Sequence, residues 1–493
     1  MLLHVDRDSA IPLHLQVRRS IRDLILRGEL NPGQSLPSLR ELAAAAGVNK
    51  LTMLKAVDGL KRAGWLDTVR GKGIFVSEHL PPDDARFDLD PAGDNHFFEG
   101  APIGPAPEEL ADGIQETVDS ARSPDVVSFG AIFPPSDIVP AGWVRMRQTA
   151  ILKEMGPAAL GYASTTGVER FTAAVRDWLA ARGLTLAPDD EILVTGGAQQ
   201  AIMLALQVLL RPGEQILIES PGYLGVISAC RLLGIGMEPV SVDKSGLDAD
   251  QLETRLKRGE FRLLFCVPDF QNPTGVTMTE TRRRRVHELC RRYGVYILED
   301  DPSGDLRFTG KAIPPIKALP DSGHVLYAGS FSKTVAPGLR VGYLVAQREV
   351  MVRLRRMKEA SDICSPALSQ LLLAEMLASG AYARHLRRAR REYRRRKAAM
   401  LAALARYLPE GSRVTDPKGG MHLWAVLPER IDTMALLKRA REAQILFTPG
   451  ALFFADRRGN NCLRLNFAAN PPDRIEDGIA RLGALIRQAE RRH

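Results

Sequence analysis

Residues 329–343 read GSFSKTVAPGLRVGY, and this stretch decides how the larger part of the chain is interpreted. It holds one lysine, Lys333, beside two hydroxyls, Ser330 and Ser332, and ahead of Arg340. A lysine that forms an imine with an aldehyde must lie where its amine can lose a proton. A phosphorylated aldehyde also needs hydrogen-bond donors, which the two serines and the arginine would supply. Taken alone the pattern is weak, because a lysine in a surface loop is far more common.

Two motifs nearer the N-terminus would bind the phosphate and the ring of such an aldehyde. TGGAQQA (195–201) follows an apolar strand and opens a helix. Free backbone amides and the helix dipole hold a phosphate at a helix start, here at Ala198 and Gln199. Tyr223, in the segment ESPGY, would stack on an aromatic ring.

Three further side chains would act on the ring or on a second ligand. Asn272, in QNPTG, lies on a turn after a strand, where its amide would bond a ring hydroxyl. Asp300 ends the strand VYILED, and a carboxylate there keeps a pyridine nitrogen protonated, which makes the ring an electron sink. Arg464, in CLRLNFA, has a planar fork that suits a substrate carboxylate. Each residue alone has an ordinary structural explanation, but together and in this order they indicate a pyridoxal phosphate site.

The chain divides into three parts by its residue patterns. From residue 124 to 493, apolar strands such as RLLFCVPD and HVLYAGS alternate with helices, which favours a parallel sheet covered by helices. The C-terminal segments MHLWAVLP and CLRLNFA predict a smaller α+β lobe. Residues 79–112 contain nine acidic residues, one arginine and six prolines, so 79–123 is predicted to be an acidic, proline-rich linker.

Residues 1–78 predict a small α+β domain. Three segments have helical spacing and end on a glycine: 13–28, 38–47 and 49–64. Ser38 is a predicted N-cap, and residues 65–77 alternate like two short strands around a turn. Helices followed by a β-hairpin in this order form the winged helix-turn-helix pattern.

This pattern predicts which side chains would contact DNA. Residues 1–78 hold twelve Lys/Arg and eight Asp/Glu, and the first residues of a recognition helix meet base edges in the major groove. The candidates are Arg40, Asn49, Lys50 and Thr52 on the helices and Arg70 and Lys72 in the wing. A helical interaction module with a solvated charged face is the alternative explanation.

Residues 12–76 resemble a GntR-family DNA-binding domain over its full length. The pieces G-x-L-x-P-G-x-x-L-P-S-x-R-E-L-A and L-x-x-x-G-W-L match in order and spacing. The family usually has arginine where this chain has Lys50, and a small polar residue where it has Leu51. Lysine does not fork onto guanine as arginine does, which bears on base preference at this position.

Residues 124–493 resemble the fold-type I aminotransferases through GYASTTG, TGGAQQA, PGY, QNPTG, LEDDP, GSFSKTVAPGLRVGY, KGGMHLW, FTPG and RLNFA. With the GntR-like head, nearly the whole chain resembles the MocR subgroup of bacterial regulators. The resemblance implies pyridoxal 5'-phosphate as cofactor, with Lys333 as the Schiff-base lysine, Asp300 at the pyridine nitrogen, Asn272 at the ring oxygen, Tyr223 on the ring, and Ala198, Gln199, Ser330, Ser332 and Arg340 at the phosphate.

The resemblance also implies a second subunit and a second ligand. Such proteins are usually head-to-tail homodimers in which Tyr162 of one subunit reaches the cofactor of the other, and Arg464 holds a ligand carboxylate. One position departs from the family, because Ser303 stands after EDDP where a tyrosine usually bonds the cofactor's ring oxygen. Serine is too short for that contact, so we predict an altered cofactor pKa and weak or absent turnover.

Composition narrows the remaining classes. The net charge of +9 over 493 residues permits binding to a polyanion without demonstrating it. The start MLLHVDRDSA lacks the apolar core of a signal peptide, and AIMLALQVLL (201–210) is too short to span a bilayer. The five cysteines form no CxxC pair. We therefore expect a cytoplasmic protein without a metal site or membrane contact.

An arginine-rich segment, RHLRRARREYRRRK (384–397), contains nine Lys and Arg residues. It is predicted to be a solvated face of the smaller lobe. The alternative is contact with DNA that flanks the recognised site, which would appear in the salt dependence of binding.

Three functions are open at this point. The first is a DNA-binding transcription regulator in which an amino compound exchanges with Lys333 on the cofactor. The second is a working aminotransferase with the head as an accessory module. The third is a sensor of pyridoxal phosphate itself. The family implies γ-aminobutyrate, taurine and D-alanine as candidate effectors, and the sequence does not select among them, name the operator, or tell activator from repressor.

Overall fold

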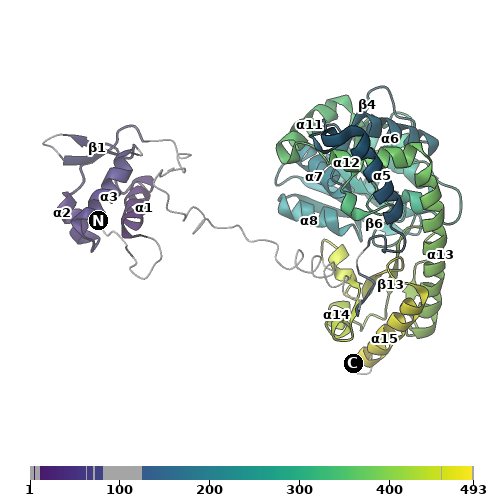
Figure 1. Ribbon diagram of the computed structural model, residues 1–493. Helices are drawn as coiled ribbons and strands as arrows, with labels where there is room; N and C mark the ends of the chain where they lie inside the picture. Colours follow the sequence, from purple (N-terminus) through teal and green to yellow (C-terminus); the bar gives the residue numbers. More distant parts are fainter. Residues whose placement is uncertain are drawn as a thin grey trace. The chain divides into compact units, whose positions relative to one another are not determined.

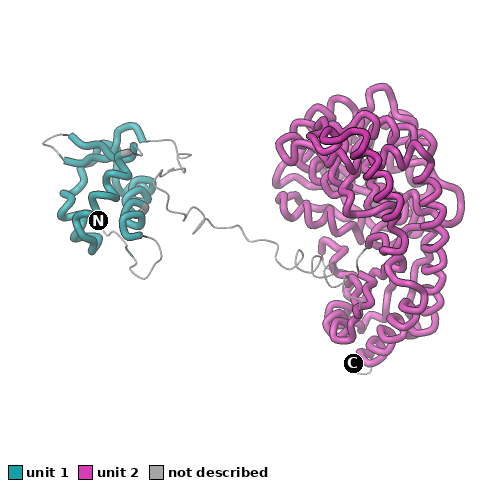
Figure 2. The backbone as a smooth tube through the Cα atoms, viewed as in Figure 1, with its two compact units in different colours: residues 1–104 teal, residues 105–493 magenta. Residues whose placement is uncertain are grey.

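The computed structural model divides into two compact units, residues 1–104 and 105–493 (Figure 2). It describes residues 5, 12–62, 64–69, 73–80, 125–130, 132–456 and 458–490. Most of the predicted linker, 79–123, lies outside these residues, so the boundaries after residues 78 and 123 stay predictions.

The first unit contains the predicted helices and hairpin. Its elements are α1 (Leu13–Leu26), α2 (Leu39–Ala45), α3 (Lys50–Arg62), β1 (Leu66–Val69) and β2 (Gly73–Val76). Ser38 caps α2 through a capping box with Glu41, and Gly28 and Gly47 have the positive φ that lets a chain leave a helix. Strands β1 and β2 pair antiparallel. The winged helix-turn-helix prediction is therefore confirmed.

The second unit, drawn in blue through green to yellow in Figure 1, is built on one eight-stranded sheet. The order of its strands is β4-β11-β10-β9-β8-β5-β6-β7. The strands are β4 (Asp190–Thr195), β5 (Gln215–Ser220), β6 (Gly236–Asp243), β7 (Gly246–Leu247), β8 (Leu263–Cys266), β9 (Tyr296–Asp301), β10 (Val325–Ser330) and β11 (Gly342–Gln347).

The prediction of a parallel sheet is right for the centre of this sheet and wrong towards its edges. Strands β6, β5, β8, β9 and β10 pair parallel. However, β11 pairs antiparallel with both β10 and β4, and β7 pairs antiparallel with β6. The reason is the short connection 331–341, which contains no α-helix and returns the chain directly beside β10.

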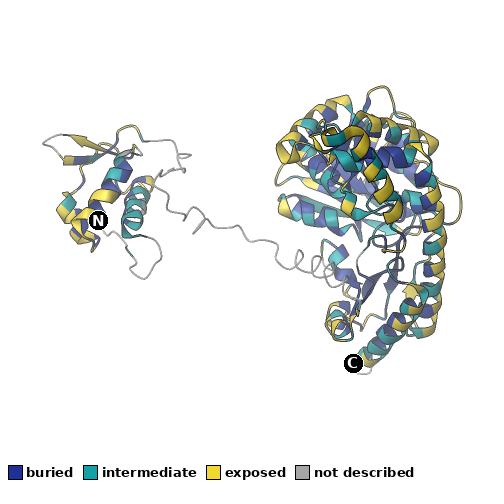
Figure 3. Ribbon diagram, viewed as in Figure 1, coloured by how far each residue is buried: buried dark blue, intermediate teal, exposed yellow. Residues whose placement is uncertain are grey.

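Helices cover both faces of the sheet, and its strands other than β6 consist mostly of buried residues (Figure 3). In β5, Ile216 and Ile218 belong to the core beneath α7, α8 and α11, whereas Leu217 joins the core beneath α9 and α10. The helices of this unit before residue 379 are α5 (Ala141–Met155), α6 (Glu169–Ala181), α7 (Ala198–Leu209), α8 (Leu224–Leu232), α9 (Ala249–Arg258), α10 (Glu280–Arg292), α11 (Arg348–Asp362) and α12 (Ala367–Ala378).

The predicted smaller α+β lobe follows. Its sheet has the order β12-β13-β16-β15, and β14 pairs with β3 from the start of the unit. The elements are β3 (Val127–Ser128), α13 (Ala381–Tyr407), β12 (Arg413–Val414), β13 (His422–Val426), α14 (Thr433–Glu442), β14 (Ile445–Leu446), β15 (Thr448–Pro449), β16 (Cys462–Asn466) and α15 (Pro472–Glu490). Among the described residues, no helix is long and apolar enough to cross a membrane.

The arginine-rich segment 384–397 lies within the 27-residue helix α13. Most of its arginines are exposed, but Arg396 is only 2% exposed. Arg396 pairs with Asp137 and Glu392 and donates a 2.7 Å hydrogen bond to the Ala468 carbonyl. It therefore holds the helix to the interior, which corrects the prediction that the whole segment is a solvated face.

Candidate functional site

The predicted cofactor residues gather at one edge of the large sheet. Ala198 follows β4, Tyr223 follows β5, Asn272 follows β8, Asp300 lies near the end of β9 and Lys333 follows β10. These strands point the same way, so their carboxyl ends meet at this edge. Binding sites of open α/β sheets lie at this edge because the loops there converge.

The start of α7 forms an anion-binding cradle with the loop before β11. Gly197 is the N-cap with φ 113°, and no side chain caps the helix, so its first amides remain available. A Cβ at Gly197 would lie 3.3 Å from a guanidinium nitrogen of Arg340, and one at Gly342 would lie 2.8 Å from the Gly197 Cα. Arg340 itself has the left-handed φ of 51°. The loop thus brings a guanidinium against a helix N-terminus, which suits a phosphate.

The two serines lie on the same loop. Ser330 Oγ accepts a 3.2 Å hydrogen bond from the backbone amide of Ser332. Both side chains are half-buried, and Ser330 ends β10 directly opposite Gly342 of β11. Their hydroxyls therefore lie on the loop that carries the lysine and faces the cradle.

The Lys333 amine lies in a buried, partly positive environment. It donates a 2.5 Å hydrogen bond to the Ile132 carbonyl. Burial, together with the charges of Arg464 and Arg340, lowers the pKa of Lys333 to about 8, although Asp300 opposes the shift. A buried amine with this pKa is a better nucleophile near neutral pH than an exposed lysine.

Asp300 is a buried carboxyl that lacks a protein partner on one oxygen. Its side chain is 3% exposed, and Oδ1 accepts no hydrogen bond from the described residues. Burial and the neighbouring Asp301 raise the pKa of Asp300 to about 8, with Lys333 opposing. An unpaired acceptor at this place fits the protonated ring nitrogen of a pyridine cofactor, which would supply both the hydrogen and the charge.

A hydrogen bond links Tyr223, which is predicted to pack on the cofactor ring, to Gln199 in the first turn of α7. The Tyr223 hydroxyl donates to Gln199 Oε1 at 3.3 Å, and Gln199 Nε2 donates to the Gly225 carbonyl at 3.0 Å. The Tyr223 ring is stacked with that of Phe265, at 6.4 Å between centroids. Burial and the nearby Asp300 raise the Tyr223 pKa to about 12, so its ring stays neutral.

Arg464 lies at the same site but belongs to the smaller lobe, on β16. It donates to Asn272 Oδ1 at 3.0 Å, to the Gly130 carbonyl at 2.7 Å and to Thr448 Oγ1 at 3.1 Å. Burial lowers its pKa to about 9, so the guanidinium is still charged at neutral pH. A guanidinium has five N–H donors, and its buried Nε has no partner among the described residues, so donors remain for a carboxylate.

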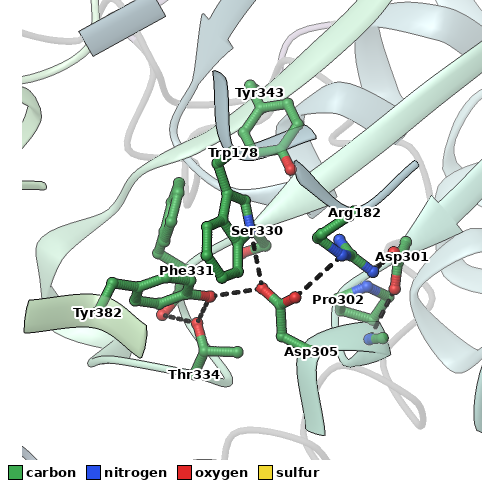
Figure 4. Close-up of a pocket in the computed structure, with 11 residues that line it drawn as sticks. Trp178, Arg182, Asp301, Pro302, Asp305, Ser330, Phe331, Thr334, Tyr343 and Tyr382 are labelled. Atoms are coloured by element: carbon green, nitrogen blue, oxygen red, sulfur yellow. Dashed lines mark hydrogen bonds and ion pairs between the residues drawn. The ribbon is translucent and has the colours of Figure 1, made fainter. Parts of the chain in front are cut away.

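A small polar pocket lies beside the loop that carries Lys333 and is lined in part by that loop (Figure 4). Asp305 accepts a 2.7 Å hydrogen bond from the Tyr382 hydroxyl and forms a 3.0 Å ion pair with Arg182. The Tyr382 hydroxyl also lies 3.0 Å from Thr334 Oγ1, next to Lys333. The cavity holds about 10 Å³, so at most about one water fits. We interpret it as support for the loop rather than as a ligand site.

The head places its predicted DNA contacts at the start of α3. Asn49 Oδ1 accepts a 2.8 Å hydrogen bond from the Thr52 amide, so Asn49 is the N-cap of the recognition helix. Arg40, Asn49 and Lys50 are exposed, and Thr52 is half-buried. The two wing residues, Arg70 and Lys72, lie outside the described residues.

Two other predicted residues lie away from these contacts. Tyr162 is 87% exposed, as expected of a side chain offered to another subunit. Ser303 is buried, and its short side chain caps no helix. Sequence reasoning did not single out Tyr382, Thr334 or His422. His422 lies in the motif KGGMHLW, which carries the family resemblance but assigns no role to this histidine.

The fold and the site together define a class. This is a winged helix-turn-helix unit joined to a fold-type I unit whose residues fit pyridoxal 5'-phosphate. Among the described residues, no cluster of three or more His, Cys, Asp or Glu side chains is suited to a metal ion.

Comparison with known proteins identifies the family. Residues 124–482 match "Aminotransferase class I and II", and residues 13–76 match "Bacterial regulatory proteins, gntR family". The chain therefore belongs to the aminotransferase class I and II family, and its GntR head makes it a member of the MocR subgroup of DNA-binding regulators.

Two regulators that match nearly the whole chain support this assignment. The uncharacterized HTH-type transcriptional regulator YisV of Bacillus subtilis is 32% identical over 96% of both chains. The probable rhizopine catabolism regulatory protein MocR of Rhizobium meliloti is 29% identical over 97% of this chain and 94% of its own length.

A solved structure bears on the cofactor. LysN, the α-aminoadipate aminotransferase of Thermus thermophilus, was crystallised with N-(5'-phosphopyridoxyl)-L-leucine. It superposes with a TM-score of 0.71 at 34% identity, covering 78% of this chain and 99% of its own. The family, this neighbour and the fit of Asp300 and the α7 cradle identify pyridoxal 5'-phosphate as the cofactor.

Proposed function

We propose that this regulator holds pyridoxal 5'-phosphate as a Schiff base on Lys333 and responds to an amino compound that takes the lysine's place. The proposal rests on two neighbouring groups. Lys333 is a buried amine with a lowered pKa, and Asp300 has a buried Oδ1 atom that accepts no hydrogen bond from the described residues. The cofactor supplies an aldehyde and, through its ring, an electron sink.

The proposed roles of the other residues are those that the family resemblance implies. Asn272 bonds the ring oxygen, Tyr223 packs on the ring, and Arg464 takes a carboxylate of the effector. The phosphate is held by Ala198, Gln199, Ser330, Ser332 and Arg340. Tyr162 acts from the second subunit of a head-to-tail homodimer.

The response requires no net redox chemistry. Lys333 condenses with the aldehyde and releases one water. An effector amine would then replace the Lys333 nitrogen at the same carbon, and the two hydrogens that the effector nitrogen gives up would return Lys333 to a free amine. The contacts that Lys333 makes to the loop therefore change when effector binds. Arg464 comes from the smaller lobe, so effector binding would also bias the position of that lobe.

A working aminotransferase is the second candidate. The candidate cofactor residues other than Ser303 favour it, while Ser303 in place of a tyrosine disfavours fast turnover. Repeated turnover with an amino donor and a keto acid would support this function. A DNA affinity that responds to pyridoxal phosphate and to no amine would support a cofactor sensor instead.

The first experiment is the visible spectrum of wild type beside Lys333→Ala. We expect a yellow wild type whose band disappears on borohydride reduction, and no such band in Lys333→Ala. Amines titrated into the wild-type band would then identify the effector. A wild type that stays colourless with added pyridoxal phosphate would contradict the proposal, leaving a DNA-binding protein with another ligand.

A further inference from the structure

A histidine that no prediction used lies at the edge of the proposed effector site. His422 begins β13, directly opposite Asn466 of β16 and two positions along the ladder from the Trp424–Arg464 pair. Residues opposite each other in a ladder share a face of the sheet, so His422, Trp424 and Arg464 lie on one face. His422 is 4% exposed.

The hydrogen bonds of His422 determine which nitrogen carries its hydrogen. Its Nε2 lies 3.2 Å from the Gln271 carbonyl oxygen. A carbonyl only accepts, so Nε2 carries the hydrogen and Nδ1 is left as an acceptor. Burial and the charges of Arg464 and Lys333 lower the pKa of His422 to about 3, so the ring stays neutral at ordinary pH.

This acceptor has no donor among the residues that the structure describes. The Nδ1 atom is buried and forms no hydrogen bond with any described residue. Most buried polar atoms are paired, because an unpaired one loses its hydration without replacement. In the same cluster, Asp300 Oδ1 and Arg464 Nε are also unpaired. The three atoms belong to residues assigned to, or adjoining, one proposed ligand site.

The backbone on either side of His422 is closely packed. A Cβ at Gly275 would lie 3.0 Å from Pro417 and 3.2 Å from the His422 carbonyl. A Cβ at Gly420 would lie 2.8 Å from Phe270. The loop before β13 is thus packed directly on the Phe270–Gly275 turn, which carries the Gln271 carbonyl that His422 contacts.

We infer that His422 is a specificity-determining residue whose Nδ1 accepts a hydrogen bond from a donor on the effector, and this inference rests on the proposed function. The effector class is then an amino acid whose carboxylate meets Arg464 and whose side chain carries a hydroxyl, amide or ammonium group. A side chain that ends in a second carboxylate has no hydrogen to donate to Nδ1. Arg464, which binds the carboxylate common to all amino acids, does not by itself distinguish between these side chains.

The test uses near-isosteric amino acids that differ by one hydroxyl. Serine is compared with 2-aminobutyrate, homoserine with norvaline, and 5-hydroxynorvaline with norleucine. Each is titrated into the cofactor band of the full-length holoprotein. In at least one pair we expect wild type to bind the hydroxyl-bearing amino acid at least about fivefold more tightly than the other amino acid. The other amino acid has no side-chain hydrogen to donate and would leave Nδ1 without a hydrogen bond.

Two variants and a control assign the effect to Nδ1. His422→Phe keeps an aromatic ring but removes the acceptor. We expect this variant to bind the two members of a pair with affinities within about twofold of each other, a difference smaller than the loss of one hydrogen bond causes. His422→Asn places an amide oxygen near the Nδ1 position, and we expect it to restore part of the preference. His287→Phe, at a buried histidine on α10, should keep the wild-type preference.

The failures are distinguishable. A colourless wild type would overturn the proposed function and this inference together. A yellow wild type that exchanges amines yet binds both members of every pair equally would overturn only the inference. The inference alone would also be overturned if His422→Phe kept both the cofactor band and the wild-type preference. If His422→Phe does not fold, His422→Asn tests the same acceptor independently.

Discussion

At the scale of single residues, the site is defined by groups whose pKa values differ from their ordinary ones. Lys333 is a buried amine, and Asp300 is a buried carboxyl, each with a pKa of about 8. The two shifts have one main cause, which is burial, and they move in opposite directions because the charged form is the acid in lysine and the base in aspartate. Both groups therefore titrate within the same narrow pH range.

The lowered pKa of Lys333 predicts a pH dependence of cofactor uptake. Deprotonation makes the amine a nucleophile, so the rate of colour development in cofactor-free protein should rise with pH through about 8 and then level off. Stopped-flow absorbance after mixing with pyridoxal phosphate measures this rate. A rate that keeps rising towards the ordinary lysine value of 10.5 would show that the amine is not buried as described.

Ser303 gives a second prediction at this scale. We expect Ser303→Tyr to move the pH titration of the cofactor band to lower pH. A phenol that donates to the ring oxygen stabilises its negative charge, and that oxygen then holds the neighbouring proton less tightly. Ser303→Ala is the control and should titrate like wild type, because the serine is too short to reach the ring. Identical titrations in all three proteins would contradict the role assigned to this position.

At the scale of elements, α13 serves two purposes along one helix. Its N-terminal turns support the lysine loop, since Tyr382 contacts Thr334 Oγ1 and His385 Nε2 lies 2.6 Å from the Thr334 carbonyl. Farther along, Arg396 ties the helix to the smaller lobe through Ala468. The exposed arginines lie on the remaining face and include Arg387, Arg391 and Arg394.

Neighbouring arginines of α13 should therefore respond differently to substitution. Arg396→Gln should lower the free energy of unfolding by about 2 kcal/mol, because it leaves the Ala468 carbonyl unpaired and breaks a largely buried ion pair. Arg394→Gln, at an exposed position two residues away, is the matched control and should change it by less than about 0.5 kcal/mol. Thermal unfolding followed by circular dichroism compares the two. Equal effects would contradict the burial of Arg396.

The start of α3 separates a structural role from a DNA-binding role. Asn49→Ala removes the cap and should destabilise the head by about 1 kcal/mol. Asn49→Asp keeps an acceptor for the Thr52 amide, so its stability should stay near wild type while its carboxylate weakens DNA binding by repelling phosphate. Thermal unfolding and fluorescence anisotropy with labelled DNA measure the two effects. Unchanged DNA affinity in Asn49→Asp would place position 49 away from the DNA.

At the scale of the whole molecule, the large unit carries exposed apolar side chains on α5 and the segment after it. Met146, Met155, Leu160 and Tyr162 are 57%, 38%, 70% and 87% exposed. Apolar surface of this kind marks an interface when it is contiguous and rimmed by polar residues. We propose that a second copy of the chain covers it, as the head-to-tail dimer requires.

A mixing experiment tests this arrangement. Tyr162→Ala and Lys333→Ala homodimers should each bind the cofactor weakly or without a Schiff base. In a mixed dimer, one site has Lys333 from one subunit and Tyr162 from the other, so subunit exchange should restore yellow sites. Absorbance after exchange, with sedimentation to verify dimers, measures the recovery. If exchange occurs and no colour returns, Tyr162 does not act across the interface.

The sequence by itself determined the winged head and the strand–helix alternation, and it supplied the candidate cofactor residues. These features depend on local signals: caps such as Ser38, glycines that end helices, apolar strands, and short motifs at strand ends. Lys333, Asp300 and Asn272 each follow or end a strand, and parallel strands bring such residues to one edge whatever their order in the sheet.

Only the tertiary structure decided which side chains are buried and unpaired. The bond between His422 and Gln271 joins residues 151 positions apart, and that between Arg396 and Ala468 joins residues 72 apart. Burial and pairing depend on all the segments that surround a side chain, so no local pattern reveals an acceptor without a donor or an arginine turned inward. For the same reason the antiparallel return of β11 beside β10 became visible only in the folded sheet.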